Sequence, residues 1–144
     1  MAGYLQALKK NGINYNSNLI IQCNSDDKKN RLLIKKLLKG KNRPDGIFAS
    51  VEKLALALYE ICAELKLNIP RDIKIISFSN LQTAALLNPS LTTITLPAFE
   101  MGREAASILF KIIEKKGTNT IIDKTLLESS LMERNSTKGK LKKK

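Results

Sequence analysis

Apolar positions along this chain alternate between two kinds of pattern, one typical of helices and one typical of strands. Spacings of three and four residues, which are typical of amphipathic helices, run through residues 3–10, 24–38, 52–66, 81–87 and 99–115. Short runs rich in β-branched residues, which are typical of strands, lie at 19–23, 47–49, 73–78 and 91–96, and one or two more strands are expected within 121–133. This alternation predicts an α/β fold with a Rossmann-like parallel sheet and helices on both faces.

The helix expected at 52–66 carries apolar residues on two faces. Leu54 and Leu58 belong to one stripe, whereas Leu56 and Tyr59 belong to another. A helix that is apolar on two sides is buried on both. The second face is therefore expected either inside the domain or against another subunit.

Composition narrows the function classes. The 144 residues suffice for one compact domain, and histidine, the commonest general base and metal ligand, is absent. Cys23 and Cys62 lie in apolar runs without metal-ligand spacing, so we expect two buried, reduced thiols in a cytoplasmic protein. No segment has the apolar length of a membrane span. We therefore expect no metal, no cofactor, no membrane association and no catalytic residue.

The net charge of +12 is concentrated at one end of the chain. Five lysines fall within the last seven residues, so residues 138–144 are expected to form a disordered Lys-rich tail. Such a tail keeps a chain soluble, and it also adds weak, salt-sensitive attraction to DNA phosphates. Both interpretations of the tail stay open.

Several short blocks follow one another along the chain. They are Gly3-Tyr4 with Ala7-Leu8, Pro44 to Ala49, Leu54-Ala55-Leu56, Ile69 to Phe78, Pro89-Ser90-Leu91-Thr92-Thr93-Ile94 followed by Pro97, Glu100-Met101-Gly102 with Ala105-Ala106, and Arg134-Asn135-Ser136-Thr137. In this order and spacing, from residue 3 to residue 137, the chain resembles the LacI/GalR (lactose-repressor) family of transcription regulators. Each block alone is a weak signal, and their succession carries the resemblance.

The resemblance implies part of an effector core with two Rossmann-like lobes of the periplasmic-binding-protein-like type. Residues 1–96 would be the second, C-terminal lobe without its first strand, because a parallel sheet whose pattern opens on a helix is expected to lack an upstream strand. Residues 97–137 would be crossover elements that return to the first lobe. The implied function is ligand sensing and dimerisation in a repressor whose operator DNA is bound by a missing N-terminal helix-turn-helix.

Candidate ligand contacts follow from the expected sheet. Ligands of open α/β sheets bind beyond the carboxyl ends of the strands, where the loops converge. The positions that follow the strands here are Ser50, Val51, Glu52, Ser79, Asn80 and Leu96. The resemblance implies effector contacts at the same points.

Four of these positions depart from the sugar-binding members of the family. Val51-Glu52 stands where those members carry Asn-Asp, Ser79 where they carry Asp, and Leu96 where some carry Gln. A carboxylate that grips neighbouring sugar hydroxyls is thereby lost. Two interpretations stay open: a less sugar-like effector, such as a sugar-acid derivative or a more apolar molecule, or a cleft that senses weakly or not at all.

The second apolar face of the 52–66 helix predicts a subunit contact. In the family that the chain resembles, this helix and the short helix before the Pro-x-Leu-Thr-Thr segment pack across a two-fold axis. We therefore predict an isologous homodimer contact through Leu56, Tyr59, Leu86 and Leu87. The alternative is that these four side chains belong to the core.

Other function classes fit the sequence less well. A periplasmic sugar-binding receptor of an ABC transporter shares the fold, but the Thr92-Thr93-Ile94 block with Met101-Gly102 and the closing Arg134-x-Ser136-Thr137 favour the regulator. An enzyme is disfavoured because no dinucleotide-binding, phosphate-loop or nucleophile-elbow motif occurs. A dimerisation module without a ligand is the third class. An upstream helix-turn-helix would indicate the regulator, and an upstream signal peptide the receptor.

Overall fold

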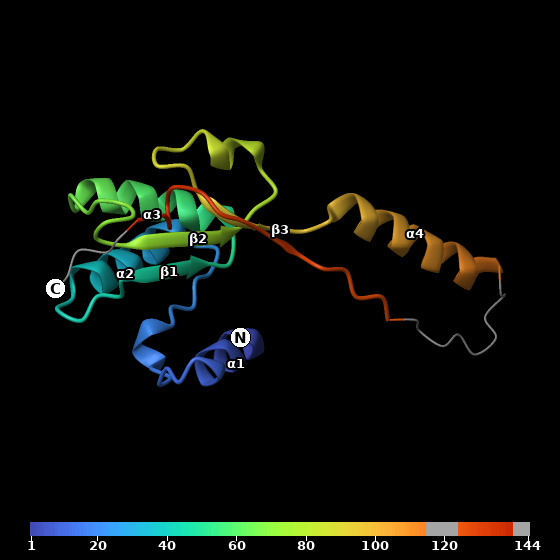
Figure 1. Ribbon diagram of the computed structural model, residues 1–144, viewed down its shortest axis with the longest axis horizontal. Helices are drawn as coiled ribbons and strands as arrows, with labels where there is room; N and C mark the ends of the chain where they lie inside the picture. The colour runs from blue at the N-terminus through green and yellow to red at the C-terminus, as the bar shows by residue number, and fades with distance from the viewer. Residues whose placement is uncertain (115–123, 140–144) are drawn as a thin grey trace.

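The computed structural model describes residues 1–114 and 124–139, and its strands form a single sheet (Figure 1). The elements are α1 (Ala2–Lys10), η1 (Ser17–Leu19), α2 (Asp27–Lys39), β1 (Gly46–Ala49), α3 (Glu52–Glu64), β2 (Lys74–Phe78), η2 (Gln82–Ala85), β3 (Thr92–Thr95), α4 (Ala98–Glu114) and β4 (Ser130–Met132). The strand order is β1-β2-β3-β4. The first three strands run parallel, and β4 joins β3 antiparallel. The predicted α/β fold is confirmed.

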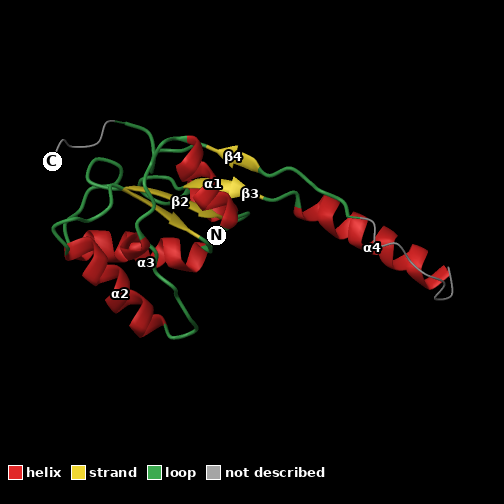
Figure 2. Ribbon diagram, turned by 90° about the horizontal axis from the view of Figure 1, so that it is seen from below, coloured by secondary structure: helices red, strands yellow, loops and turns green. Residues whose placement is uncertain are grey.

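Helices lie on both sides of the sheet. In Figure 2, α2 and α3 lie together on one side of the strands and α1 on the other. The start of α2 follows from its sequence, because the Asp26 carboxylate accepts a hydrogen bond from the Lys29 N–H (3.1 Å) and so satisfies a donor of the first turn. Arg31 of α2 forms ion pairs with Glu60 and Glu64 of α3, which hold the two helices side by side.

The core lies between the sheet and the α2–α3 layer. Its members are Ile34, Leu38, Ala49, Ala55, Leu58, Ile61, Cys62, Ile73, Ile75, Ala84 and Leu91. Alternate residues of β2 face this layer, which is why Ile75 is fully buried whereas Phe78, at the end of the strand, is exposed. Cys62 is a buried free thiol as expected, while Cys23 is a half-buried one.

The closing Ser136 joins the C-terminal segment to the centre of the sheet. Its buried hydroxyl accepts a hydrogen bond from the Thr92 N–H (2.8 Å) and donates one to the Ile75 carbonyl (2.6 Å). The Arg134 guanidinium adds bonds to the Leu91 carbonyl and the Thr93 hydroxyl, each 2.8 Å long. The Arg-x-Ser-Thr block therefore has a structural role, since it connects β2 and β3 where their ladder begins.

Some elements differ from the prediction. Residues 19–23 have the composition of a strand but pair with none of the described strands. A strand exists only through a neighbour's hydrogen bonds, and residues 1–114 and 124–139 provide no such neighbour for this segment. The helix expected at 81–87 shortens to the 3-10 turn η2, and the strands expected within 121–133 reduce to β4. Residues 121–123, and 140–144 of the expected tail, lie outside the described residues.

Helix α4 extends away from the body of the fold (Figure 1). At helical spacing, one side of this helix is formed by small and apolar residues: Gly102, Ala105, Ala106, Leu109, Ile112 and Ile113. No residue of α4 is buried, and Leu109 and Ile113 are 56% and 61% exposed. The helix thus has the amphipathic pattern that was predicted, and its apolar side is not covered by the described part of the chain.

Candidate ligand site at the strand ends

The predicted ligand contacts gather at one edge of the sheet. Glu52 begins α3 after the short turn that follows β1, Ser79 and Asn80 follow β2, and Leu96 follows β3. The three strands are parallel, so their carboxyl ends meet at the same edge. Ser50 and Val51, in the turn between β1 and α3, are exposed there.

A short hydrogen bond connects the loops after β1 and β2. The Ser79 hydroxyl donates to Glu52 Oε2 (2.7 Å) and accepts from the Leu81 N–H (3.1 Å). Hydrogen bonds to a carboxylate are stronger than neutral ones, and the first turn of a helix favours a negative charge. Ser79 therefore holds the half-buried Glu52 carboxylate in place at this edge.

Asn80 binds the crossover rather than the open edge. Its Nδ2 donates to the Leu96 carbonyl (2.6 Å), and its Oδ1 accepts from the Leu96 N–H (2.8 Å). The amide thus pairs with one residue through both of its ends, as another peptide group would. This pair fixes the direction in which the chain leaves β3 toward α4, while the Leu96 side chain stays 43% exposed.

Two aromatic residues next to this edge were not among the ligand contacts predicted from the sequence. The rings of Phe48 and Phe78 pack edge to face, with centroids 5.3 Å apart and planes at 76°. Both remain partly exposed on the sheet face opposite α2 and α3. The signal that could have found them in the sequence is their position near the ends of two predicted strands. In the β1–β2 register Phe48 is level with Ile76, so Phe48 and Phe78 lie on the same face of the sheet. Aromatic side chains of this kind line many ligand sites.

Comparison with known proteins places this geometry in a family. Residues 1–137 match the periplasmic binding protein-like domain. The chain belongs to this family. Its sequence relatives within the family include the transcriptional regulator MalR of Clostridium butyricum, which is 31% identical over 93% of this chain.

Solved structures of the family agree with the fold. A putative LacI-family regulator from Sanguibacter keddieii superposes with a TM-score of 0.85, at 27% identity over 96% of this chain. The transcriptional regulator CelR, solved in complex with cellobiose, superposes with a TM-score of 0.81, at 25% identity over 93%. The relatives are thus transcription regulators of LacI type rather than enzymes. The chain spans 39% of the length of MalR and 51% of the Sanguibacter chain.

Four residues of this periplasmic binding protein-like domain were predicted to form a dimer contact. They fall into two groups by their exposure. Leu56 and Leu86 are exposed, at 44% and 82%. Tyr59 and Leu87 are half-buried and pack against the core. The Tyr59 hydroxyl donates to the Pro89 carbonyl (2.7 Å), and burial raises the pKa of Tyr59 to about 12. Tyr59 thus connects α3 to the turn after η2, and Leu56 and Leu86 are the exposed apolar positions of the set.

Residues 1–114 and 124–139 contain neither a metal-ligand cluster nor a membrane-spanning helix. No group of three or more cysteine or acidic side chains lies close enough to bind a metal ion in this part of the chain. None of the helices described there is long and apolar enough to cross a membrane.

Proposed function

We propose that this chain is the ligand-sensing and dimerisation portion of a LacI-type transcription regulator, a repressor that works in the cytoplasm. The observation that carries the proposal is the family match over residues 1–137, together with relatives that are regulators. In this proposal an N-terminal helix-turn-helix outside the 144 residues binds operator DNA. The chain itself is assigned no catalytic role.

We propose further that residues 97–137 return to the first lobe, and that the ligand cleft lies between the two lobes. The apolar side of α4 supports this, because Leu109, Phe110 and Ile113 are more than half exposed. An amphipathic helix gains its stability by packing that side. Asn80 is then a positioning residue, since its two bonds to the Leu96 backbone fix the start of the crossover.

The effector that suits the cleft is a neutral molecule with hydroxyl groups and an apolar face. Glu52 offers carboxylate oxygen to hydroxyl donors, and it repels anions, which argues against a carboxylated effector. Val51, Leu96 and Phe78 offer apolar surface near the same edge. The cellobiose bound by CelR, a structural relative, belongs to this chemical class.

Calorimetry on the longer protein that carries this domain tests the proposal. We expect a neutral sugar to bind more tightly than the corresponding sugar acid or sugar phosphate. Glu52→Gln should weaken sugar binding, whereas Glu128→Gln, at an exposed position, should leave it unchanged. Preference for the acids would overturn the effector class, and binding of none of the three would overturn the sensing role.

The nucleotide sequence upstream of Met1 tests the regulator itself. A helix-turn-helix encoded there supports it. A signal peptide would instead indicate a periplasmic receptor.

The exposed Leu56 and Leu86 support dimerisation through α3 and η2. We propose that these two leucines meet their counterparts across a two-fold axis, with Tyr59 and Leu87 beneath them. In such a dimer, an effector that favours one lobe orientation changes the spacing of the two DNA-binding domains.

A further inference from the structure

Three loops at the amino ends of the parallel strands form one surface of the fold (Figure 1). The first loop connects α2 to β1, the second connects α3 to β2, and the third follows the closing Arg-x-Ser-Thr block. Arg43 of the first loop pairs with Asp72 of the second (3.9 Å), and Gly139 of the third lies beside Pro70 of the second. We call this surface the basic end, and it consists of residues 39–45, 66–74 and 137–139.

The basic end carries a net positive charge. Its acidic side chains are Asp45 and Asp72, and its seven basic ones are Lys39, Lys41, Arg43, Lys66, Arg71, Lys74 and Lys138. Among the described residues, Arg43 is the only one of the seven that forms an ion pair. Its partner Asp72 also accepts two hydrogen bonds from Asn68 (2.8 and 3.1 Å). Of the other six basic side chains, all but the half-buried Lys74 are exposed to solvent.

Helix ends account for only part of this charge. Helices α2 and α3 both end here, at Lys39 and Glu64, and the C-terminus of a helix carries roughly half a negative charge. Two such ends and the exposed Asp45 leave an excess of about four positive charges outside the Arg43–Asp72 pair. The opposite end, where α2 and α3 begin, is balanced by three acidic and three basic side chains: Asp26, Asp27, Glu52, Lys28, Lys29 and Lys53.

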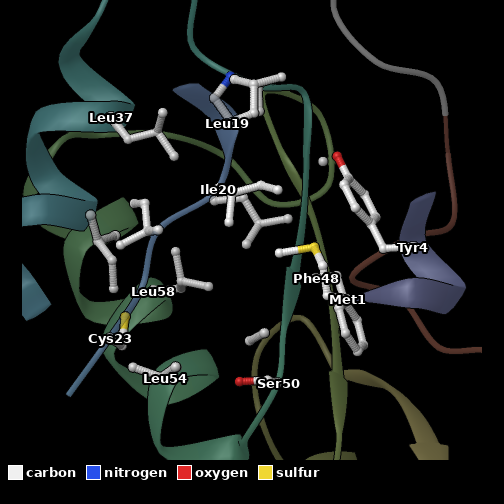
Figure 3. Close-up of a pocket in the computed structure, with 16 residues that line it drawn as sticks. Met1, Tyr4, Leu19, Ile20, Cys23, Leu37, Phe48, Ser50, Leu54 and Leu58 are labelled. Carbon is white, nitrogen blue, oxygen red and sulfur yellow. The ribbon is translucent and has the colours of Figure 1, made fainter. Parts of the chain in front are cut away.

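The basic end lacks the apolar surface that a protein partner would need. None of the residues in its three segments is an exposed large apolar side chain. Apolar surface gathers elsewhere, in a groove of about 320 Å³ between residues 19–23 and the outer edge of β1 (Figure 3). Protein interfaces are built around an apolar core, whereas interfaces with DNA are polar and strongly positive. The chemistry of the basic end therefore matches a phosphate backbone.

We propose that the basic end binds the phosphate backbone of duplex DNA irrespective of base sequence. Lysine and arginine side chains that neutralise phosphates release bound counterions, and this release is the source of sequence-independent affinity. The exposed cations come from three separate loops, so they suit successive phosphates of a polymer rather than one small anion. Four more lysines follow in the sequence, at 140 and 142–144. The contact is independent of the ligand site at the carboxyl ends of the strands and of any helix-turn-helix.

Fluorescence anisotropy on the 144-residue chain tests this. The probe is a fluorescein-labelled duplex of arbitrary sequence, titrated at several salt concentrations between about 50 and 200 mM NaCl. We expect the logarithm of the association constant to fall linearly with the logarithm of the salt concentration. The slope should be about −4 or steeper, because each phosphate neutralised by one of the five exposed cations contributes about −0.9.

Paired charge reversals locate the contact. Lys66→Glu combined with Arg71→Glu should weaken binding at least ~10-fold and make the slope shallower by about 2. Lys28→Glu combined with Lys111→Glu changes the net charge equally, at exposed positions outside the basic end. This control should alter binding by less than ~3-fold, because salt screens charges more than a Debye length away. Equal weakening by both pairs would overturn the proposal, since net charge alone would then explain the binding.

A milder variant and a shortened chain separate the basic end from folding and from the last lysines. Lys41→Gln combined with Lys138→Gln removes two exposed charges from the other two loops and should also make the slope shallower by about 2. A chain that ends at Gly139 should still bind the duplex. Loss of binding in the shortened chain, with unchanged binding in both basic-end variants, would assign the contact to residues 140–144 and overturn the proposal.

Two further outcomes would also overturn it. The first is that the full chain fails to bind the duplex at the lowest salt concentration. The second is tighter binding to vesicles of phosphatidylcholine and phosphatidylserine than to the duplex at the same salt concentration, which would assign the basic end to a membrane surface.

Discussion

Replacing Ser136 by alanine removes one hydroxyl from the centre of the sheet. This side chain is fully buried, and its two hydrogen bonds connect the Ile75 carbonyl of β2 to the Thr92 N–H of β3. Ser136→Ala keeps the backbone bonds of residue 136, in which its N–H donates to the Ser90 carbonyl and its carbonyl accepts from the Ile75 N–H. The substitution therefore isolates the contribution of the hydroxyl.

The cost comes from two backbone groups that lose their partner inside the protein. A buried polar group left without a hydrogen bond costs about 1–3 kcal/mol. Partial relaxation around two adjacent groups brings the expected loss for Ser136→Ala to roughly 2–4 kcal/mol. Domains of this size have unfolding free energies of about 5–15 kcal/mol, so the loss is a large share of the total.

Urea unfolding followed by circular dichroism measures this loss. We expect the midpoint to fall while the slope of unfolding free energy against urea stays the same, because the surface exposed on unfolding is unchanged. Ser129→Ala, at an exposed position, is the matched control and should shift the unfolding free energy by less than ~0.5 kcal/mol. A loss below ~0.5 kcal/mol for Ser136→Ala would refute the argument, because leaving two buried backbone groups without their hydrogen bonds should cost more than that.

Three further predictions concern other parts of the molecule. Leu56→Glu should make the longer regulator monomeric at micromolar concentration in sedimentation velocity, whereas Leu32→Glu on α2, also exposed, should leave it dimeric; a dimeric Leu56→Glu protein would exclude α3 from the contact. Burial raises the pKa of Cys62 from 9.0 to about 11 and that of Tyr59 from 10.0 to about 12, so the folded state holds both protons more tightly than the unfolded state. The unfolding free energy should therefore be full below about pH 9 and fall as pH rises from 9 toward 12. In Cys62→Ala it should fall less steeply with pH, and equal slopes for the two proteins would contradict this. Asn80→Ala should speed amide exchange at Leu96 by ~10-fold or more, because the Leu96 N–H loses its hydrogen-bond acceptor. Asn80→Asp keeps that acceptor and should slow the exchange again. Unchanged exchange in Asn80→Ala would show that the Asn80 side chain does not hold the crossover.

The sequence by itself determined the elements whose pattern is local. The stripe that includes Leu58 predicted the buried face of α3, and the run up to Phe78 predicted β2, because periodic burial is visible within one segment. It also determined which residues follow each strand. In a parallel sheet those positions share one edge, so Glu52, Ser79 and Leu96 were predicted near one another without knowledge of the contacts.

Tertiary structure alone decided which groups pair. Asn80 was predicted to face a ligand, but its partner is the Leu96 backbone, 16 positions away. The hydroxyl of Ser136 bonds to Ile75, 61 positions away, which no local pattern reveals. Residues 19–23 have a strand's composition, yet a strand requires a hydrogen-bonding neighbour, and beside them lies a groove. Composition and spacing determine what a segment is able to form, whereas the choice of partner depends on which distant backbone groups the fold brings within hydrogen-bonding distance.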